Sequence, residues 1–253
     1  MTEKAIQNIY NNLFHWEGKH ASQPYPIHKK LDSKKFGYTD IYKWIANTYK
    51  LNPETYILDA GCGVGYGSLY LSKYYNCNVK GISLSDAEVK KANTFAEKEN
   101  QDNKVNFKQQ SFDNLQPNTY DFIIAIESIK HTLDINKTLN SLKNALKTNG
   151  TLVIIDDFLV EENNSGSLKK YSKDWKLKVL LKNNDFSQDF SLKKDLTPVV
   201  RTKNSMTLYL SILISSIMKP FIKIASIMRG GFYLEKLFKS GAMKYYVLEY
   251  KKL

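Results

Sequence analysis

The stretch "YILDAGCGVGYG" at residues 56–67 decides the fold. It begins with a short apolar run and then places four glycines within seven positions, at 61, 63, 65 and 67, in a chain of 253 residues with only 12 glycines. An apolar run that stops at glycine is typical of a buried parallel strand that leads into a turn. Such a turn has three alternative roles. It simply reverses the chain, it cradles a phosphate, or it lets the backbone approach a flat cofactor.

Strand-like and helix-like segments alternate after this stretch. Strand-like segments lie at 78–83, 105–110, 120–127, which is strongly apolar, and 150–156, with a last one at 245–253. The clearest helix-like segments lie at 85–100 and about 134–147. Strands separated by helices of this length are typical of βαβ units. The sequence therefore predicts an α/β fold built on a doubly wound, Rossmann-like, mostly parallel sheet.

The flanks of this core differ from it. Residues 1–50 are aromatic and helix-like, and they predict a helical N-terminal lid. Residues 51–157 form the alternating core, and 158–253 predict a substrate cap with the last strands. Within this cap, residues 158–243 look irregular and carry an apolar stretch at 206–229. No repeat or linker rich in Pro, Gly or Ser divides the chain, so we expect a single domain over 1–253.

The net charge of +12 comes from lysines that are spread along the chain. Arg201 and Arg229 are the only arginines. Because arginine is the usual residue for bidentate phosphate and base contacts, the composition predicts a solvated lysine surface and no nucleic-acid partner. A membrane surface or an anionic substrate stays open.

Cys62 and Cys77 give neither a disulfide framework nor zinc spacing, and we expect no metal. The N-terminus is polar and lacks a signal-peptide core. The 13-residue apolar run at 206–218 is too short to span a bilayer. We expect a soluble, cytoplasmic protein.

Two phosphate-binding motifs fit the glycine turn poorly. The dinucleotide fingerprint G-x-G-x-x-G would place Tyr66 or Ser68 at its third glycine, and the second strand ends in Ser83 rather than in a carboxylate. A P-loop would continue into Gly-Lys-Ser/Thr, which does not follow here. The remaining pattern is D-x-G-x-G-x-G at the end of a strand.

This pattern resembles the first motif of class I S-adenosylmethionine-dependent methyltransferases. The segments "LDAGCGVG", "VKGISLS", "YDFIIAIE" and "LKTNGTLVIIDD" follow in the family's order, from about residue 52 to 157. The resemblance implies a seven-stranded sheet, S-adenosylmethionine as cofactor and S-adenosylhomocysteine as product. It also implies that Gly61, Gly63 and Gly65 approach the amino acid and ribose, and that Asp59 orders the loop or receives the ammonium group.

The segment "GISLSDAEV" resembles the second motif of the sterol, tocopherol and cyclopropane-fatty-acid branch. The resemblance implies that Ser83, Leu84 and Glu88 hold the ribose, although the family usually has glutamine where Glu88 stands. Ser85 and Glu88 also have the spacing of a helix capping box, so Glu88 could serve the cap instead.

The adenine end of the cofactor falls on "QQSFDNL". Relatives often have an aspartate where Ser111 stands, or an aromatic–acid pair that matches Phe112 and Asp113. Phe112 offers a face for stacking, and Asp113 offers an acceptor for the exocyclic amine. Asp113 could equally be a turn residue.

The segment "AIESIKHT" follows the fourth strand and resembles the "I-E-x-x-x-H" stretch of sterol and tocopherol methyltransferases. The resemblance places Glu127 and His131 opposite the transferred methyl, where they would position the acceptor or remove its proton. The cyclopropane-type enzymes have a Glu-His pair, but here Lys130 precedes His131. In the alternative interpretation, Glu127 contacts backbone or cofactor and His131 is a structural polar residue.

Distal segments "DLTPVV" and "GGFYLEKLFKSGAMKYYVLEY" also look like those of the sterol and tocopherol enzymes. The resemblance implies methyl transfer to a lipophilic, isoprenoid-like small molecule, with C-methylation favoured. The run at 206–218 could line an apolar acceptor pocket, rest on a membrane surface or pack in the core, and residues 14–30 are expected to cover the cofactor. The alternatives are an O- or N-methyltransferase of a polar natural product and a non-catalytic cofactor-binding module.

Overall fold

The computed structural model describes residues 2–14, 21–161, 166–186, 188–218 and 225–253. The strands are β1 (Tyr56–Ala60), β2 (Asn78–Ser83), β3 (Val105–Gln109), β4 (Tyr120–Ile126), β5 (Leu146–Leu159), β6 (Ser191–Asp195) and β7 (Met243–Lys251). The α-helices are α1 (Glu3–Leu13), α2 (Ser33–Phe36), α3 (Ile41–Tyr49), α4 (Tyr66–Tyr75), α5 (Asp86–Lys98), α6 (Ile135–Ala145), α7 (Gly166–Asp174), α8 (Ser205–Met218) and α9 (Ala225–Ser240). Short 3₁₀ helices are η2 (Ile129–His131), η3 (Asn183–Asp185) and η4 (Thr197–Val199).

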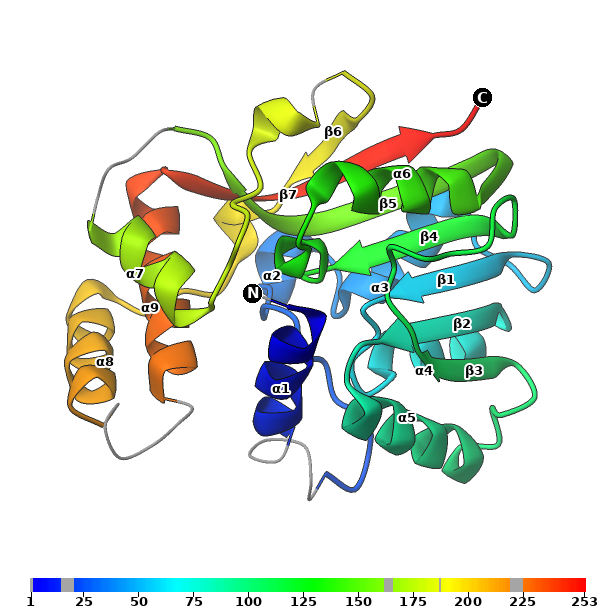
Figure 1. Ribbon diagram of the computed structural model, residues 1–253, viewed down its shortest axis with the longest axis horizontal. Helices are drawn as coiled ribbons and strands as arrows, with labels where there is room; N and C mark the ends of the chain where they lie inside the picture. The colour runs from blue at the N-terminus through cyan, green and yellow to red at the C-terminus, as the bar shows by residue number, and fades with distance from the viewer. Residues whose placement is uncertain (1, 15–20, 162–165, 187, 219–224) are drawn as a thin grey trace.

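One seven-stranded sheet organises the molecule, in the order β3-β2-β1-β4-β5-β7-β6 (Figure 1). Strands β1 to β5 are parallel, and β7 runs antiparallel between β5 and β6. Neighbouring residues of β1 point to opposite faces, so Ile57 packs in the hydrophobic cluster that includes α3, α4 and α5, and Leu58 packs in the cluster that includes α6. The predicted doubly wound, mostly parallel sheet is confirmed.

The chain reverses its direction of winding between β1 and β4. It moves outward from β1 through β2 to β3, then returns to the other side of β1 and builds β4 and β5. Ligands of open α/β sheets bind at such a switch point, beyond the carboxyl ends of the strands. The backbone N–H groups of Gly61 and Cys62 both donate to the carbonyl of Ile82, at 2.9 Å, so the glycine turn is fixed at this edge.

The core strands and helices lie within a few residues of their predicted positions, but the C-terminal third differs from its prediction. Strand β5 begins earlier, at Leu146, which pairs with Tyr120 of β4, and it continues to Leu159 because β7 pairs with it from Thr151 onward. The described part of the segment expected to be irregular holds three α-helices, two 3₁₀ helices and β6, so that prediction is wrong. Helix α9 forms because its apolar residues recur at helical spacing, and Tyr233, Leu234 and Leu237 are buried. Figure 1 shows α7, α8 and α9 grouped beyond the carboxyl ends of the strands.

The N-terminal segment folds back over the same end of the sheet. Asn11 of α1 donates to Asp86 at the start of α5, at 3.2 Å, and accepts from Ser85, at 2.5 Å. Further along, Leu31 forms an antiparallel bridge with Val200. Helix α1 and the segment around residue 31 are thus anchored on different parts of the fold, and residues 21–30 between them contain no helix.

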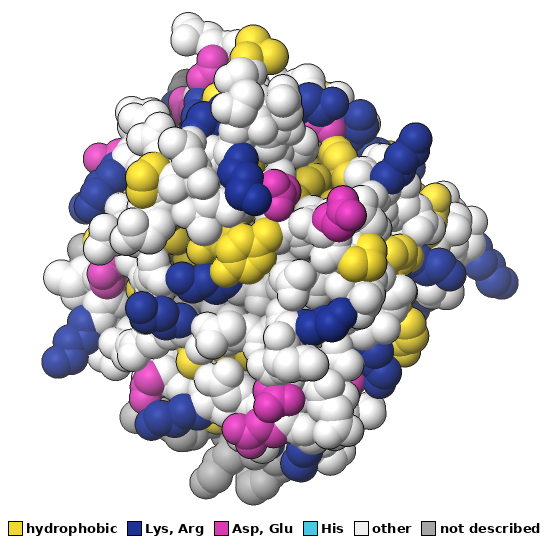
Figure 2. Space-filling view, turned by 90° about the vertical axis from the view of Figure 1, so that its right-hand side faces the viewer, with side chains coloured by type: hydrophobic (Ala, Val, Ile, Leu, Met, Phe, Trp, Pro, Cys, Tyr) yellow, Lys and Arg dark blue, Asp and Glu magenta, His cyan; other side chains and the backbone are white. Residues whose placement is uncertain are grey.

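Basic side chains are scattered over one face of the molecule. Figure 2 shows the face on the right of Figure 1, where Lys and Arg side chains alternate with acidic and small apolar groups. This distribution agrees with the predicted solvated lysine surface.

Candidate functional site

A cavity lies between the carboxyl ends of the central strands and the N-terminal segment. Its floor includes Gly61, Gly63, Ser83 and Glu88, and side chains of α1 and of residues 25–28 form the opposite wall. Most of the predicted site residues therefore meet in one place, as the topology of a parallel sheet requires.

The first two glycines of the turn leave no room for side chains. At Gly61, φ is +96° and a Cβ would lie 2.3 Å from the Cβ of Ser128. At Gly63, φ is +53° and a Cβ would lie 2.7 Å from Cδ1 of Ile27. Both residues line the cavity, so a ligand can approach their backbone closely. Gly65 has a different place, because it caps α4 and does not line the cavity.

Asp59 orders the glycine turn from below. It is buried on β1 and accepts a hydrogen bond of 2.7 Å from Ser68 Oγ of α4. Burial raises the pKa of Asp59 to about 6, and the hydrogen bonds from Ser68 oppose that rise. Because Asp59 does not line the cavity, this geometry supports the loop-ordering role rather than contact with an ammonium group.

Ser83 and Glu88 form a polar pair on the cavity floor, next to Leu84. Ser83 Oγ donates to Glu88 Oε2 at 2.6 Å, and burial raises the pKa of Glu88 to about 7 against the effect of that hydrogen bond. Ser85 Oγ accepts from the backbone N–H of Glu88 at 3.2 Å and caps α5. Helix capping therefore uses the backbone of Glu88, and its carboxylate is left to face the cavity.

The three residues expected near adenine are separated. Phe112 lines the cavity. Ser111 instead donates to Glu3 of α1 at 2.8 Å, and Asp113 accepts from Thr138 of α6. Of these three side chains, the geometry keeps only Phe112 in position to stack on a flat ligand.

Glu127 comes directly after β4 and is held in the left-handed region, with φ of +51°. Its carboxylate accepts from the backbone N–H of Lys29 at 2.6 Å, from Lys29 Nζ at 2.9 Å and from the Tyr245 hydroxyl at 3.0 Å. Burial alone would raise its pKa, but Lys29 and Lys130 hold the pKa of Glu127 well below its ordinary value. Glu127 is thus an ionised, fully engaged carboxylate.

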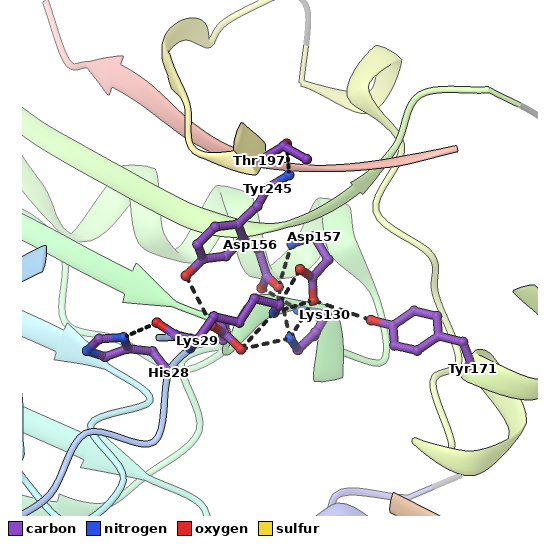
Figure 3. Close-up of polar contacts among 9 residues, drawn as sticks. His28, Lys29, Lys130, Asp156, Asp157, Tyr171, Thr197 and Tyr245 are labelled. Atoms are coloured by element: carbon purple, nitrogen blue, oxygen red, sulfur yellow. Dashed lines mark hydrogen bonds and ion pairs between the residues drawn. The ribbon is translucent and has the colours of Figure 1, made fainter. Parts of the chain in front are cut away.

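Glu127 belongs to a buried charge cluster, which we define as Lys29, Glu127, Lys130, Asp156 and Asp157. Lys130 Nζ lies 2.9 Å from Asp157 Oδ2 and 3.3 Å from Asp156 Oδ1. Burial raises the pKa of Asp156 to about 6, although Lys130 acts in the opposite direction. Figure 3 shows Lys29 reaching from the N-terminal segment between Tyr245 and the two aspartates of β5. The charge cluster therefore fixes the lid to the centre of the sheet.

His131 ends η2 and lies at the border of this cluster. Tyr10 packs edge-on against its ring at 5.2 Å between centroids, and Trp175 lies at 5.9 Å. Burial, assisted by Lys130, lowers the pKa of His131 to about 3. Its Nε2 has no hydrogen-bond partner among the described residues, and the side chain lines the cavity. His131 is a neutral imidazole in an aromatic setting.

Several cavity residues were not identified from the sequence. Tyr10 lines the cavity and Lys29 contacts Glu127 beside it; both come from the predicted lid, but no motif marks them. Trp175, which also lines the cavity, comes from just after α7. Lys130 was noted only as a departure from a family pattern. Residues 15–20 of the predicted lid lie outside the described part of the chain. Across the described residues, no group of three or more His, Cys, Asp and Glu side chains could hold a metal ion.

Known proteins share this arrangement. The family model "Methyltransferase domain" matches residues 51–204. Sterol 24-C-methyltransferase of Kluyveromyces lactis is 31% identical over 102 residues, which are 40% of this chain and 28% of the relative. Norajmaline N-methyltransferase of Rauvolfia serpentina is 34% identical over 101 residues, or 39% of this chain and 35% of the relative. The chain thus spans about a third or less of these relatives.

A solved structure matches over nearly the whole length. It is geranyl diphosphate C-methyltransferase from Streptomyces coelicolor A3(2), crystallised with Mg²⁺, geranyl diphosphate and S-adenosylhomocysteine. The TM-score is 0.71 at 14% identity, and 99% of this chain and 98% of the other are covered. This similarity shows the fold. Together with the family match over more than half of the residues, it shows that the chain belongs to the methyltransferase-domain family, among the class I S-adenosylmethionine-dependent methyltransferases.

Proposed function

We propose that the protein transfers a methyl group from S-adenosylmethionine to a lipophilic, isoprenoid-like small molecule, and that it methylates carbon. The observation that carries the proposal is the neutral His131, which lines the cavity beside the rings of Tyr10 and Trp175. The sterol and geranyl diphosphate C-methyltransferases among the similar proteins support the same substrate class.

The floor of the cavity fits the cofactor. The crowded glycines Gly61 and Gly63 would bring backbone to its amino-acid end, and Ser83 and Glu88 would accept the ribose hydroxyls. Phe112 would stack on adenine. The bound cofactor supplies an electrophilic methyl group. The residues beyond Glu127 then decide which acceptor it reaches.

The acceptor end suits a reaction through a carbocation. When an alkene carbon takes up the methyl, the neighbouring carbon becomes positive, and aromatic faces such as those of Tyr10 and Trp175 stabilise a cation. A C–H bond beside a carbocation is very acidic, so a weak base is sufficient to take the proton and restore the double bond. His131, with a pKa lowered to about 3 and an unpaired Nε2, is such a base.

The same imidazole suits a hydroxyl acceptor less well. General-base catalysis is most effective when the pKa of the base lies near the operating pH, and that of His131 lies far below. Glu127 is engaged by Lys29 and Tyr245, so we assign it to positioning rather than to proton removal. Its position beside the cavity also adds negative charge near a developing cation.

A product assay tests the proposal. The protein is incubated with cofactor carrying a trideuterated methyl group and with prenyl diphosphates and sterol-like alkenes, and with polar amines and phenols as the comparison set. The C-methylated product should gain the labelled methyl and lose one hydrogen of the acceptor. Labelling of the amines or phenols alone would favour the O- or N-methyltransferase, for which the norajmaline enzyme is a precedent. Cofactor binding without any labelled product would favour a non-catalytic module.

Two substitutions then separate the roles of His131 and Glu127. We expect His131→Ala to lower turnover by about 10²-fold, the usual effect of removing a positioned base, with S-adenosylhomocysteine affinity nearly unchanged. Glu127→Gln should lower turnover and raise the KM for the acceptor, because it loosens Lys29. The double variant should lose less than the product of the single effects. Full turnover in His131→Ala would refute the assignment of the base.

A further inference from the structure

Helix α8 turns large apolar side chains toward solvent. Six of them form what we call the α8 stripe, with exposed fractions of 45% to 70%: Met206, Tyr209, Leu210, Leu213, Ile214 and Ile217. Their positions follow the spacing i, i+3, i+4, i+7, i+8 and i+11, which defines one side of a helix. The stripe is therefore continuous along the helix.

The inner side of α8 is mixed. Leu208 is 4% exposed and Ile212 packs against the hydrophobic core, while Ser215 is 6% exposed and donates, like Ser216, to the carbonyl of Ile212. A surface helix of a globular protein normally places its apolar residues inward and its polar residues outward. In α8 the outward side carries large apolar residues as well, and within the described residues nothing covers the stripe.

The position of α8 separates the stripe from the cavity. Figure 1 shows α8 at the outer edge of the molecule, packed on α9 and away from the sheet. No residue of α8 lines the cavity, so the interpretation of the 206–218 run as an acceptor-pocket lining is wrong. Leu208 is buried and Ile212 packs against the core, so the core-packing interpretation holds for the inner side of the run and leaves the stripe unexplained.

Basic residues gather at the N-terminal end of α8. The backbone N–H of Lys203 donates to Glu235 of α9, and Lys239 Nζ donates to the carbonyl of Lys203, so the end of α9 lies beside the start of α8. Arg201 and Lys236 are also exposed here. From Arg201 to Lys239 the sequence holds seven basic residues and a single acidic one, Glu235.

We propose that the α8 stripe binds the surface of a lipid membrane that contains anionic lipids. A helix that lies in the interface buries its apolar side at the boundary of the acyl chains, while nearby cations attract anionic head groups. Tyr209 suits the interface because its ring is apolar and its hydroxyl can reach water. Over the described ranges, no helix combines the length and apolarity needed to cross a bilayer, so α8 lies along the surface.

Vesicle flotation tests this proposal without knowledge of the acceptor. The full chain is mixed with vesicles of phosphatidylcholine alone or with about one third phosphatidylglycerol. We expect binding to the anionic vesicles and at least tenfold weaker binding to the neutral ones. Lys236→Gln should lower binding to the anionic vesicles by roughly fivefold, the scale expected for the loss of one cation near the surface. Tyr209→Asp and Ile214→Asp should each lower binding at least tenfold, with unchanged thermal unfolding.

Tyr74→Asp is the matched control. Tyr74 lies on α4 and is 64% exposed, compared with 65% for Tyr209, so it adds the same charge in place of the same exposed ring elsewhere on the surface. The control variant should bind vesicles like the unchanged protein. Equal losses in Tyr74→Asp and Tyr209→Asp would overturn the proposal. So would a protein that binds no vesicles and forms a dimer that Ile214→Asp dissociates, because the stripe would then be an interface between two copies.

Discussion

Two adjacent glycines in α9 allow a sharp test of how Trp175 is placed. A Cβ at Gly230 would lie 2.6 Å from Cδ1 of Trp175 and 3.1 Å from the Cβ of Asp174, whereas a Cβ at Gly231 would meet nothing within 4 Å. The end of α7 is held against α9 here, because Arg229 donates to both carboxylate oxygens of Asp174, at 2.7 and 2.6 Å. The ring of Trp175 therefore has to move if Gly230 gains a methyl group.

The magnitudes follow from helix propensity and crowding. Both glycines lie in the interior of α9, where alanine is favoured over glycine by about 1 kcal/mol. Gly231→Ala should gain this amount and raise Tm by about 2–4 °C, the scale for a domain of this size. For Gly230→Ala, overpacking costs about 1–3 kcal/mol, so the net free energy of unfolding should be unchanged or lower by up to about 2 kcal/mol.

The functional readout separates the two variants further. In Gly230→Ala the displaced Trp175 ring no longer lies beside His131, so we expect a higher KM for the acceptor and unchanged affinity for S-adenosylhomocysteine. Gly231→Ala should leave both values unchanged. Thermal unfolding and steady-state kinetics of the pair provide the measurement. Two variants of equal stability and equal KM would refute the placement of Trp175 against the helix.

Three further predictions concern ligands. S-adenosylhomocysteine affinity should weaken as the pH falls through about 7, because Glu88 becomes protonated there and is a poorer acceptor for ribose hydroxyls. Calorimetry at pH 6 and pH 8 measures this dependence, and Glu88→Gln should remove it. Calorimetry should also give micromolar binding of S-adenosylhomocysteine, about −8 kcal/mol, and no binding of nicotinamide dinucleotides. The Gly63→Val variant should not bind S-adenosylhomocysteine, because its Cβ would contact Ile27. Finally, a DNA or RNA complex that persists below micromolar concentration at physiological salt would contradict the prediction of no nucleic-acid partner, since dispersed lysine contacts weaken steeply with salt.

The parallel core could be predicted because its signals are local. The central strand at 120–126, for example, is a nearly continuous apolar run, and the glycine turn is crowded in ways that exclude other residues. The cap was harder to predict. Helix α8 is apolar on most sides, so its sequence carries little periodic signal, and only the packing on α9 shows which side is exposed.

The site residues that could be predicted are those at or shortly after the carboxyl end of a strand. Ser83, Glu88, Glu127 and His131 follow strands and reach the cavity as expected. Lys29 reaches Glu127 across a sequence separation of 98 residues. No pattern in the sequence encodes a contact of that kind, because it depends on how the lid and the sheet pack together.

The bridge from Lys29 to Glu127 and Asp157 has a consequence for the fidelity of the proposed reaction. The part of the cavity wall at residues 25–28 belongs to the same segment as Lys29, so these ion pairs hold that part of the wall in place. A carbocation that met bulk water would be captured as an alcohol. In the proposed reaction, the lid therefore selects between two products, an alkene when proton loss occurs in a closed cavity and a hydrated side product when the cavity opens too early.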